Sequence, residues 1–373
     1  MPLGTRPEII KLAPVVATLK QRGAEVTVVA TGQHYDANLS SNFFADLGMT
    51  PTVQWHLNGS PSERIGSILG RAIEFVAERS PDVVLLLGDT NTVPLFCLAA
   101  RTSRIPVAHL EAGLRSFNPT SLEEVNRRVA GALASLHFAP TPLAAKFLRE
   151  EGVATGAIRV VGNPIVDVLR RSGCTPLAPG LREGAVVTVH RPTNVDDPSR
   201  LAELVRLLER LPGIVGPVTF PVHPRTRGRL EATGLDRALD SSGVRLLEPL
   251  RWEAMLELLR SCRVVVTDSG GLQEEASYFG VPVVVLRTST PRWEGVEAGT
   301  SVLTGLDGDA AVKAVRAFLR EEVQQRVAAA PCPYGDGYTA ERVADVLFDP
   351  RTRDLLSLRE PPSGRSPLVR EAQ

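Results

Sequence analysis

Short apolar, β-branched runs alternate with amphipathic stretches along the whole chain, and this alternation constrains the fold more than any other feature. Continuous apolar strands separated by helices are typical of a parallel sheet that helices cover on both faces. The sequence therefore predicts an α/β fold of the doubly wound class. The runs predicted to be strands are Glu25–Thr31, Val83–Leu87, Ile105–Leu110, Ala185–His190, Arg263–Thr267 and Val281–Leu286.

The pattern occurs twice, and a segment rich in proline and glycine, residues 170–184, separates the two copies. At 373 residues the chain is also too long for one ordinary core. We expect two Rossmann-like domains, each with a doubly wound parallel sheet, that face a cleft. The first domain is predicted at 1–172, joined by the C-terminal helical residues 338–358, the second at 183–337, and a disordered tail at 359–373.

Composition narrows the classes of function. Forty-two basic residues balance forty-two acidic ones, so no overall field favours nucleic acid or membrane surfaces as partners. The four cysteines form no C-x-x-C pair, which indicates neither a zinc site nor a disulfide framework and favours a cytoplasmic location. No apolar run approaches the ~18 residues of a membrane span. An anionic ligand must then be held by a local site, and nothing indicates a metal or a redox cofactor.

The segment Asp268–Glu275, Asp-Ser-Gly-Gly-Leu-Gln-Glu-Glu, follows an apolar strand and opens a predicted helix. Gly270 and Gly271 let an anion approach the backbone, and the helix N-terminus adds a partial positive charge. A diphosphate fits such a site, although a plain tight turn has the same local sequence. The chain has no G-x-x-x-x-G-K-[ST] loop and no G-x-G-x-x-G fingerprint, which argues against metal-dependent phosphoryl transfer and against hydride transfer.

Open parallel sheets bind ligands beyond the carboxyl ends of their strands, and several chemically active side chains follow predicted strands. Asp89 follows the run Val83–Leu87 and is either a helix N-cap or an acid/base group. Glu111 ends another strand, where a buried carboxylate needs a partner or a function. Arg115 is the candidate partner of Glu111.

Glu123 and Glu124 begin a predicted helix, where acidic side chains interact favourably with the helix dipole and need no other explanation. His190 ends a strand and is followed by Arg191, a pairing suited to phosphate binding or to proton transfer. His223 is either a site residue or a packed histidine. Carboxylates and a histidine that face a diphosphate site indicate an acid/base enzyme for a nucleotide-linked substrate.

Taken together, a series of segments from Gly4 to about Val346 resembles the non-hydrolysing UDP-N-acetylglucosamine 2-epimerases. The resemblance implies a glycosyltransferase-B arrangement of two Rossmann-like halves, and a homodimer. It also implies interconversion of UDP-GlcNAc and UDP-ManNAc. In this reaction loss of the C2 proton and of UDP gives a 2-acetamidoglucal, to which UDP is then added again. The segments are Gly4–Pro14, Thr31–His34, Gly88–Thr92, His109–Ser116, Glu123–Arg127, Gly162–Pro164, His190–Arg191, Pro221–His223, Asp268–Glu275 and Pro333–Gly337.

The resemblance also assigns roles to residues. It implies that Asp89, Glu111 and Glu123 form the acid/base set and that His190 lies near the sugar and the diphosphate. The other matched residues bind the substrate, where Glu275 accepts from the ribose hydroxyls. Ser269, Gly270 and Gly271 contact the diphosphate, and the residues expected to contact the nucleotide sugar are Arg6, Lys11 and Arg292.

Arg191 and His223 resemble, with Gln33, parts of a second site at which many bacterial relatives bind UDP-GlcNAc as an activator. Asp36 stands there in place of a glutamine and would repel the activator's diphosphate. The sequence thus predicts an enzyme that acts on UDP-ManNAc without added UDP-GlcNAc.

Several departures from the family's pattern are present. Leu122 replaces a proline before Glu123, which affects the placement of that carboxylate. Met255 stands where an aromatic residue often packs on uracil and Thr288 where aspartate is common, which predicts weaker uridine binding. Three alternatives remain open: a hydrolysing epimerase that releases ManNAc, a glycosyltransferase of the same fold, and a catalytically degraded nucleotide-sugar-binding protein.

Overall fold

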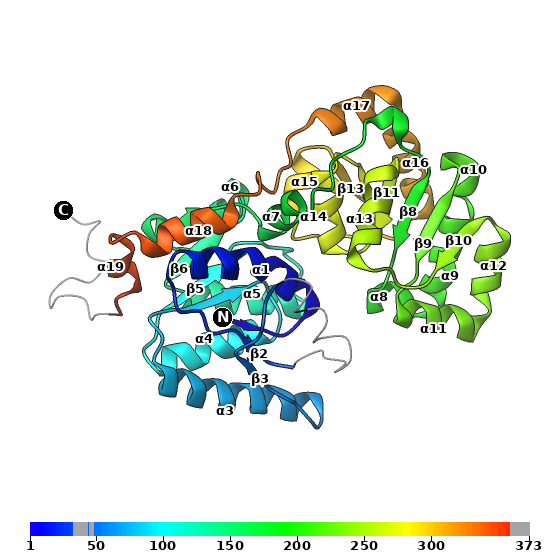
Figure 1. The fold of residues 1–373 in the computed structure, drawn as a ribbon. Helices are drawn as coiled ribbons and strands as arrows, with labels where there is room; N and C mark the ends of the chain where they lie inside the picture. The colour runs from blue at the N-terminus through cyan, green and yellow to red at the C-terminus, as the bar shows by residue number, and fades with distance from the viewer. Residues whose placement is uncertain (33–43, 45–47, 359–373) are drawn as a thin grey trace, which may run out of the picture.

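The computed structural model describes residues 1–32, 44 and 48–358, and within them the strands form three sheets that are parallel throughout. The N-terminal half contains a sheet of order β1-β2-β3 and a sheet of order β4-β5-β6-β7, and the C-terminal half contains one of order β10-β9-β8-β11-β12-β13. Figure 1 shows the two halves side by side, each with helices packed around its strands. The predicted α/β fold with two Rossmann-like halves is confirmed.

Several helices of the N-terminal half have proline at one of their first two positions, where its fixed φ suits the helix. The predicted tail, together with Gln33 and Asp36, lies outside the described residues. The elements of this half are β1 Pro2–Leu3, α1 Arg6–Gln21, β2 Val29–Ala30, β3 Val53–Gln54, α3 Pro61–Arg79, β4 Val84–Leu87, α4 Thr92–Thr102, β5 Val107–Leu110, α5 Leu122–Leu133, β6 Leu136–Ala139, α6 Pro142–Glu150, η1 Thr155–Ala157, β7 Ile158–Val160 and α7 Pro164–Arg171.

Residues 172–178 connect the N-terminal half to the C-terminal half. After the last helix of the C-terminal half, the chain returns to the N-terminal half. The elements of the C-terminal half are η2 Pro179–Leu181, β8 Ala185–Thr188, α8 Pro192–Val195, α9 Pro198–Glu209, α10 Pro212–Val215, β9 Val218–Pro221, α11 Pro224–Thr233, α12 Leu235–Ser241, β10 Val244–Leu247, α13 Trp252–Ser261, β11 Val264–Thr267, α14 Gly270–Tyr278, β12 Val283–Val285, α15 Trp293–Glu297, β13 Ser301–Leu303, α16 Gly308–Phe318 and α17 Glu321–Ala329.

Two further helices, α18 Thr339–Phe348 and α19 Thr352–Leu356, end the described chain. Helix α18 packs against α1 and α7, far from its sequence neighbours in the C-terminal half (Figure 1). The buried carboxylate of Asp167 accepts hydrogen bonds from the backbone N–H groups of Thr339 at 3.1 Å and Ala340 at 2.8 Å. Asp167 therefore satisfies the free N–H groups at the start of α18 and fixes this crossing of the chain.

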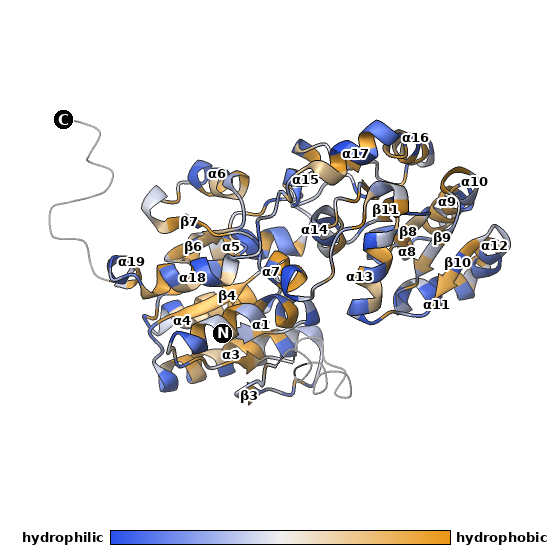
Figure 2. Cartoon of the chain, turned by 45° about the horizontal axis from the view of Figure 1, so that its top comes forward, coloured by the Kyte–Doolittle hydropathy of each residue, from blue (hydrophilic) through white to orange (hydrophobic). Residues whose placement is uncertain are grey.

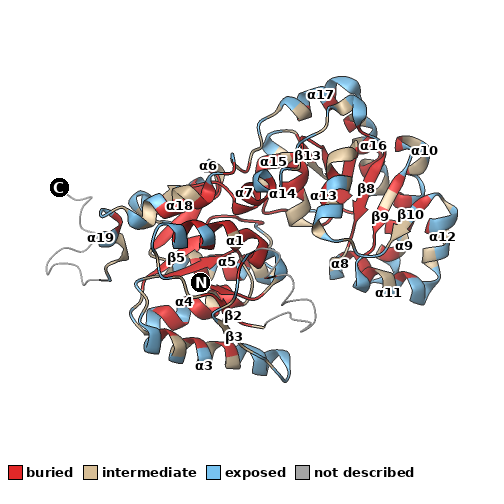
Figure 3. Ribbon diagram, in the orientation of Figure 1, coloured by how far each residue is buried: buried red, intermediate tan, exposed pale blue. Residues whose placement is uncertain are grey.

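The central strands are buried on both faces, as their continuous apolar sequences predict. Figure 2 shows the apolar residues gathered in the strands and on the inner sides of the helices, and Figure 3 shows that these residues are buried. The predicted strand Glu25–Thr31 is shorter in the structure. Only Val29 and Ala30 pair with the neighbouring strands, since β1 and β3 have two residues each. Within the described residues no helix is long and apolar enough to cross a membrane.

Two histidines are buried side by side on the paired strands β5 and β6. His109 and His137 are register partners, and neither Nδ1 atom has a hydrogen-bond partner. His109 Nε2 donates to the carbonyl oxygen of Gly88 at 2.8 Å. Burial lowers the pKa of each histidine to about 4, so both rings are neutral at pH 7.

We expect acid to destabilise the fold through these rings. The unfolded chain binds protons below pH 6.5 that the folded rings accept only near pH 4, so the unfolding free energy falls across this interval. The loss is about 3 kcal/mol for each histidine. Urea unfolding followed by circular dichroism should show a smaller fall for His109→Gln than for the unmodified protein. His56→Gln, an exposed control, should keep the original pH dependence.

Candidate active site

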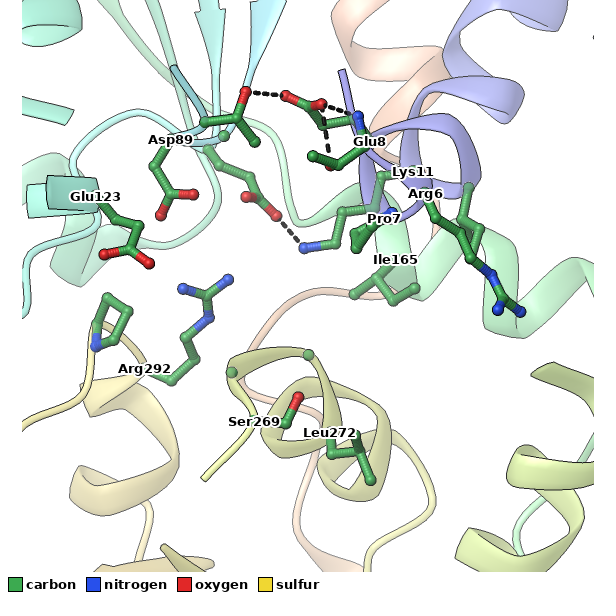
Figure 4. Close-up of a pocket in the computed structure, with 18 of the residues that line it drawn as sticks. Arg6, Pro7, Glu8, Lys11, Asp89, Glu123, Ile165, Ser269, Leu272 and Arg292 are labelled. Carbon is green, nitrogen blue, oxygen red and sulfur yellow. Dashed lines mark hydrogen bonds and ion pairs between the residues drawn. The ribbon is translucent and has the colours of Figure 1, made fainter. Parts of the chain in front are cut away.

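A cavity of about 440 Å³ lies between the two halves, beyond the carboxyl ends of strands from both. Figure 4 shows Asp89 and Glu123 on one side of it, with Ser269 and Leu272 at the start of α14 on the other. All of the predicted site residues except His223 line this cavity. They are Arg6, Lys11, Asp89, Glu111, Glu123, His190, Arg191, Ser269, Gly270, Gly271, Glu275 and Arg292.

Glu111 follows β5 with a left-handed backbone, at a φ of 60°. This conformation is unfavourable for a residue with a Cβ, and residues held in it cluster at functional sites. The buried Glu111 carboxylate accepts a hydrogen bond from Lys11 Nζ at 2.5 Å. Burial opposes ionisation, but Lys11 and Arg292 outweigh it and hold the pKa of Glu111 below its usual value. Glu111 is therefore ionised at neutral pH.

The partner predicted for Glu111 was wrong. Arg115 is fully buried and makes two hydrogen bonds to Glu151, from Nε at 2.8 Å and from Nη2 at 2.6 Å. Gly113, with a φ of 86°, turns the chain between Glu111 and Arg115, and a Cβ on it would lie only 2.2 Å from the carbonyl oxygen of Ala144. This turn directs the arginine toward α6 and away from the cavity carboxylate.

Asp89 is not a helix cap, because α4 has Asn91 as its N-cap. The Asp89 carboxylate instead forms an ion pair with Arg127 Nη1. Arg127 is buried and also donates from Nη2 to Glu124 Oε2 at 2.8 Å, and the same carboxylate accepts from the backbone N–H of Ser116 at 2.8 Å. Arg127 is not among the site residues predicted from the sequence, although the i, i+3 spacing of Glu124 and Arg127 indicates that they are neighbours on a helix.

The adjacent carboxylate, Glu123, has a different environment. Its side chain is 43% exposed, lines the cavity and accepts a hydrogen bond from Ser121 Oγ at 2.6 Å. Arg191 of the C-terminal half lies 3.6 Å from Glu123 Oε1. Partial burial opposes ionisation, but the Ser121 hydroxyl and Arg191 lower the pKa of Glu123. Leu122 therefore does not prevent the neighbouring carboxylate from facing the cavity.

The opposite wall is the start of α14, which follows β11 directly. Ser269 is the N-cap residue, its side chain makes no capping hydrogen bond, and Gly270 and Gly271 form the first turn. The first N–H groups of a helix have no partner within the helix, so this edge of the cavity offers donors and a partial positive charge to an anion. The Arg292 guanidinium lies close to the same turn. If Gly270 had a Cβ, that atom would lie 3.6 Å from Arg292 Cζ.

Asp268 fixes the turn after β8 beside this helix start. Its buried carboxylate accepts from the backbone N–H groups of His190 at 3.1 Å and Arg191 at 2.9 Å. His190 Nδ1 lies 3.3 Å from Asp268 Oδ1. Burial lowers the pKa of His190 and nearby His223 and Arg191 reinforce the effect, although Asp268 opposes it. His190 thus faces the cavity as a neutral ring at pH 7.

His223 lies outside the cavity lining. Its exposed ring caps α11, with Nδ1 accepting from the backbone N–H of Arg225 at 3.2 Å. The alternative of a packed histidine is therefore wrong, because the ring is exposed. The ring centre is 5.4 Å from that of His190, so His223 adjoins the cavity histidine. Its role as a binding residue stays a prediction.

One end of the cavity is mainly apolar and contains a buried carboxylate. Leu250, Trp252, Met255 and Leu272 line this end together with Glu275. Trp252 Nε1 donates to Glu275 Oε1 at 3.3 Å, and burial raises the pKa of Glu275 to about 7. Position 255 lacks an aromatic residue, as the sequence shows. Trp252, which the sequence pattern does not mark, supplies an aromatic ring to the same wall of the cavity.

Two more buried carboxylates belong to the site and are not singled out by the sequence analysis. Glu274 accepts from Lys11 Nζ at 2.9 Å and from Arg292 Nε at 2.8 Å. Glu8 accepts from the backbone N–H of Thr5 at 2.8 Å and the hydroxyl of Thr90 at 2.7 Å, and burial raises its pKa to about 7. Glu8 and Glu274 lie in segments that carry the family resemblance, but only their contacts in the structure distinguish them from the other residues of those segments. In the described residues no group of three or more His, Cys, Asp or Glu is placed to hold a metal ion.

Two parallel-sheet halves whose strand ends face one cavity define an α/β protein of the glycosyltransferase-B-like class, and the solved structures it resembles share this arrangement. Within that class, the chain belongs to the UDP-N-acetylglucosamine 2-epimerase family, whose sequence profile matches residues 17–348.

Similar proteins differ in the sugar that their names specify. The UDP-N-acetylglucosamine 2-epimerase of Methanocaldococcus jannaschii is 35% identical over 361 residues, covering 92% of this chain and 97% of the relative. The UDP-2,3-diacetamido-2,3-dideoxy-D-glucuronate 2-epimerase of Pseudomonas aeruginosa is also 35% identical, over 356 residues, covering 92% and 98%. The crystal structure of the M. jannaschii enzyme with UDP-GlcNAc and UDP superposes with a TM-score of 0.82, covering 93% of this chain and 98% of that one.

We expect the adjacent acids of α5 to differ in their effect on stability. Glu124→Gln should lower the unfolding free energy by about 2 kcal/mol, because it removes the charge that the buried Arg127 is paired with. Glu123→Gln should change it by less than about 0.5 kcal/mol, since that side chain is only half-buried and its charged neighbour Arg191 is itself partly exposed. Denaturant unfolding of both variants measures the difference, and equal losses would contradict the assignment.

Proposed function

We propose that the chain catalyses the reversible epimerisation of UDP-GlcNAc at C2 to UDP-ManNAc without net hydrolysis. The observation that carries the proposal is one cavity that Asp89, Glu111 and Glu123 line together with the start of α14 and Arg292. Such a site combines proton transfer with binding of a diphosphate. Family membership and the names of the relatives support the substrate class.

The proposed reaction begins with removal of the C2 proton by an ionised carboxylate. The electron pair of the C–H bond forms a C1–C2 double bond, and the C1–O bond breaks with its electrons leaving on UDP. The resulting 2-acetamidoglucal stays in the cavity, takes a proton on the other face of C2 and is rejoined by UDP at C1. Two faces require two proton-handling groups, and we assign these roles to Glu111 and Glu123. The lowered pKa values keep both ionised before the reaction, so either can take the C2 proton, and the one that delivers a proton to the other face must first take it up from solvent.

A C2 proton of a sugar is only weakly acidic, so stabilisation of departing UDP must contribute most to the rate. We assign the diphosphate to Ser269, Gly270 and Gly271 at the start of α14, with Arg292 beside them. Arg6, Lys11 and neutral His190 also line the cavity, and we assign contacts with the nucleotide sugar to them. Arg191 and His223 are proposed as further binding residues next to His190.

The nucleoside is assigned to the apolar end of the cavity. The ribose hydroxyls would donate to Glu275, whose carboxylate already accepts from Trp252. The Trp252 ring, beside Met255, offers an aromatic surface for uracil. This assignment separates a nucleotide-holding C-terminal half from an N-terminal half that carries the acid/base groups.

We also propose the domain division 1–172 with 338–358, and 183–337. The strands of each sheet fall within one of these parts, and α18 packs against α1 and α7, which supports the return of the chain to the first domain. A homodimer is proposed from the family resemblance, and a cytoplasmic location from the absence of a disulfide or zinc pattern among the cysteines.

A hydrolysing enzyme, a glycosyltransferase and a sensor without activity give different products. The first releases ManNAc, the second leaves C2 unchanged and the third produces nothing. The similarity to the P. aeruginosa relative also makes UDP-2,3-diacetamido-2,3-dideoxyglucuronate a competing substrate. NMR of reaction mixtures with each UDP-sugar identifies the sugar product and decides among these functions.

We expect the C2 hydrogen to exchange with solvent during turnover, because the proposed route breaks the C2–H bond. In heavy water, UDP-ManNAc formed from UDP-GlcNAc should carry deuterium at C2, detected by NMR and mass spectrometry. Retention of the original hydrogen in the product would refute the elimination route.

Variants of the two halves should separate chemistry from binding. Glu111→Gln should lower kcat by at least ~10²-fold and leave UDP affinity nearly unchanged, since it removes a proton-transfer group. Glu275→Ala should weaken UDP binding more than it lowers kcat, because it removes the proposed ribose acceptor. Steady-state kinetics and calorimetric titration with UDP measure both effects. Similar behaviour of the two variants would contradict the division of roles.

A further inference from the structure

Glu274 and Glu275 are adjacent on α14 but have different surroundings. Glu275 lines the cavity, whereas Glu274 is fully buried. Glu274 Oε1 accepts hydrogen bonds from Asn163 Nδ2 at 2.9 Å and from Arg292 Nε at 2.8 Å, and its Oε2 accepts one from Lys11 Nζ at 2.9 Å. Lys11 and Asn163 belong to the N-terminal half. One carboxylate of the C-terminal half thus collects donors from both halves.

The ammonium group of Lys11 is shared between two carboxylates. Its Nζ lies 2.5 Å from Glu111 Oε1 and 2.9 Å from Glu274 Oε2, and all of these side chains are buried. Burial lowers the pKa of Lys11, but Glu111 and Glu274 outweigh it and hold the pKa above its usual value. The lysine is therefore charged, and a buried ammonium requires an anionic partner.

In the proposed reaction Glu111 loses its charge. When it takes the C2 proton, a carboxyl O–H replaces the carboxylate, and its ion pair with Lys11 is lost. Burial, Lys11, Arg292 and a hydrogen bond from Asn163 set the proton affinity of Glu111. Among the described residues, Glu274 is the other acid that Lys11 contacts. The Lys11 ammonium therefore has an anionic partner both before and after Glu111 takes the proton.

We propose that Glu274 is a positioning residue that keeps Lys11 charged and in place while Glu111 holds the substrate proton. The inference rests on the proposed function, in which Glu111 accepts that proton. Lys11 remains bound to Glu274 after Glu111 is neutralised, so the ammonium neither moves into the cavity nor loses its own proton. Glu274 acts through Lys11 and touches no reacting atom.

The arrangement also links proton uptake to the departure of UDP. Before the reaction Lys11 and Arg292 balance Glu111 and Glu274, so these buried groups carry no net charge. Protonation of Glu111 leaves one excess positive charge at the moment when UDP separates from C1 as an anion. In a cavity of low dielectric this charge stabilises the leaving group. Proton transfer and C1–O cleavage therefore favour each other.

The test is Glu274→Gln, assayed for epimerisation by NMR and for UDP affinity by calorimetry, which also reports that the site is folded. Without the second acid, Lys11 depends on Glu111 alone, so protonation of Glu111 becomes unfavourable. We expect kcat to fall about 10²-fold while the Kd for UDP changes by less than about threefold, because the start of α14 is unaltered. This separation of kcat from Kd would not follow from a merely structural role.

Two further variants complete the experiment. Glu294→Gln is the matched control, because Glu294 is also buried and also joins the halves, through Thr141 Oγ1 at 2.5 Å, without contacting Lys11. Its kcat should stay within about threefold of the unmodified protein. Glu274→Asp keeps the charge and should recover kcat to within about tenfold. If the glutamine variant does not fold, the aspartate variant carries the test, because its shorter side chain weakens the contact with Lys11 and should lower kcat by more than it weakens UDP binding.

A kcat near that of the unmodified protein in Glu274→Gln overturns the inference. A loss of UDP affinity as large as the loss of kcat also overturns it, because Glu274 would then serve only to anchor Arg292. Failure of the proposed function is distinguishable from both results. In that case the unmodified protein itself would form no UDP-ManNAc from UDP-GlcNAc.

Discussion

The active-site cavity depends on a lysine buried between two acids from different halves. Lys11 on α1 binds Glu111 after β5 and Glu274 on α14, over sequence separations of 100 and 263 residues. A charge withdrawn from water is stable only with close partners, so this contact fixes the distance between the halves locally. The same contact sets the charge of Glu111, which makes domain association and the proposed acid/base chemistry parts of one interaction.

The parallel sheets of the two halves explain why the remaining groups meet there. Chain segments that leave the carboxyl ends of the strands in both halves turn toward one space, and α14 begins directly after β11. Local backbone geometry then places individual groups. Glu111 has an unfavourable positive φ, and Gly113 turns the following chain so closely past α6 that no Cβ is accommodated. The fold thus supports strain at the carboxylate that we propose as a proton-transfer group.

The sequence predicts the layers and most of the cavity lining, because strand runs and the residues just after them are local features. It predicts partners poorly. Arg115 is four residues from Glu111 but binds Glu151, whereas the true partner Lys11 is far away in the sequence. Asp89 has a sequence suited to a helix cap, yet its ion pair with Arg127 depends on how α5 packs against the strand ends. Such contacts follow from tertiary packing, which periodicity does not encode.

Both pairs of adjacent glutamates in the site show how one helix turn divides two tasks. Successive residues of a helix point roughly 100° apart, so a pair at a cavity edge sends one carboxylate toward the cavity and the other toward the interior. On α5, Glu123 faces the cavity while Glu124 binds buried Arg127. On α14, Glu275 faces the cavity while Glu274 binds buried Lys11 and Arg292. In each pair the inner acid holds a cation that also reaches an acid of the cavity, Asp89 through Arg127 and Glu111 through Lys11. The inner acids therefore contribute to the charge balance beside the cavity, although neither is among the residues that line it.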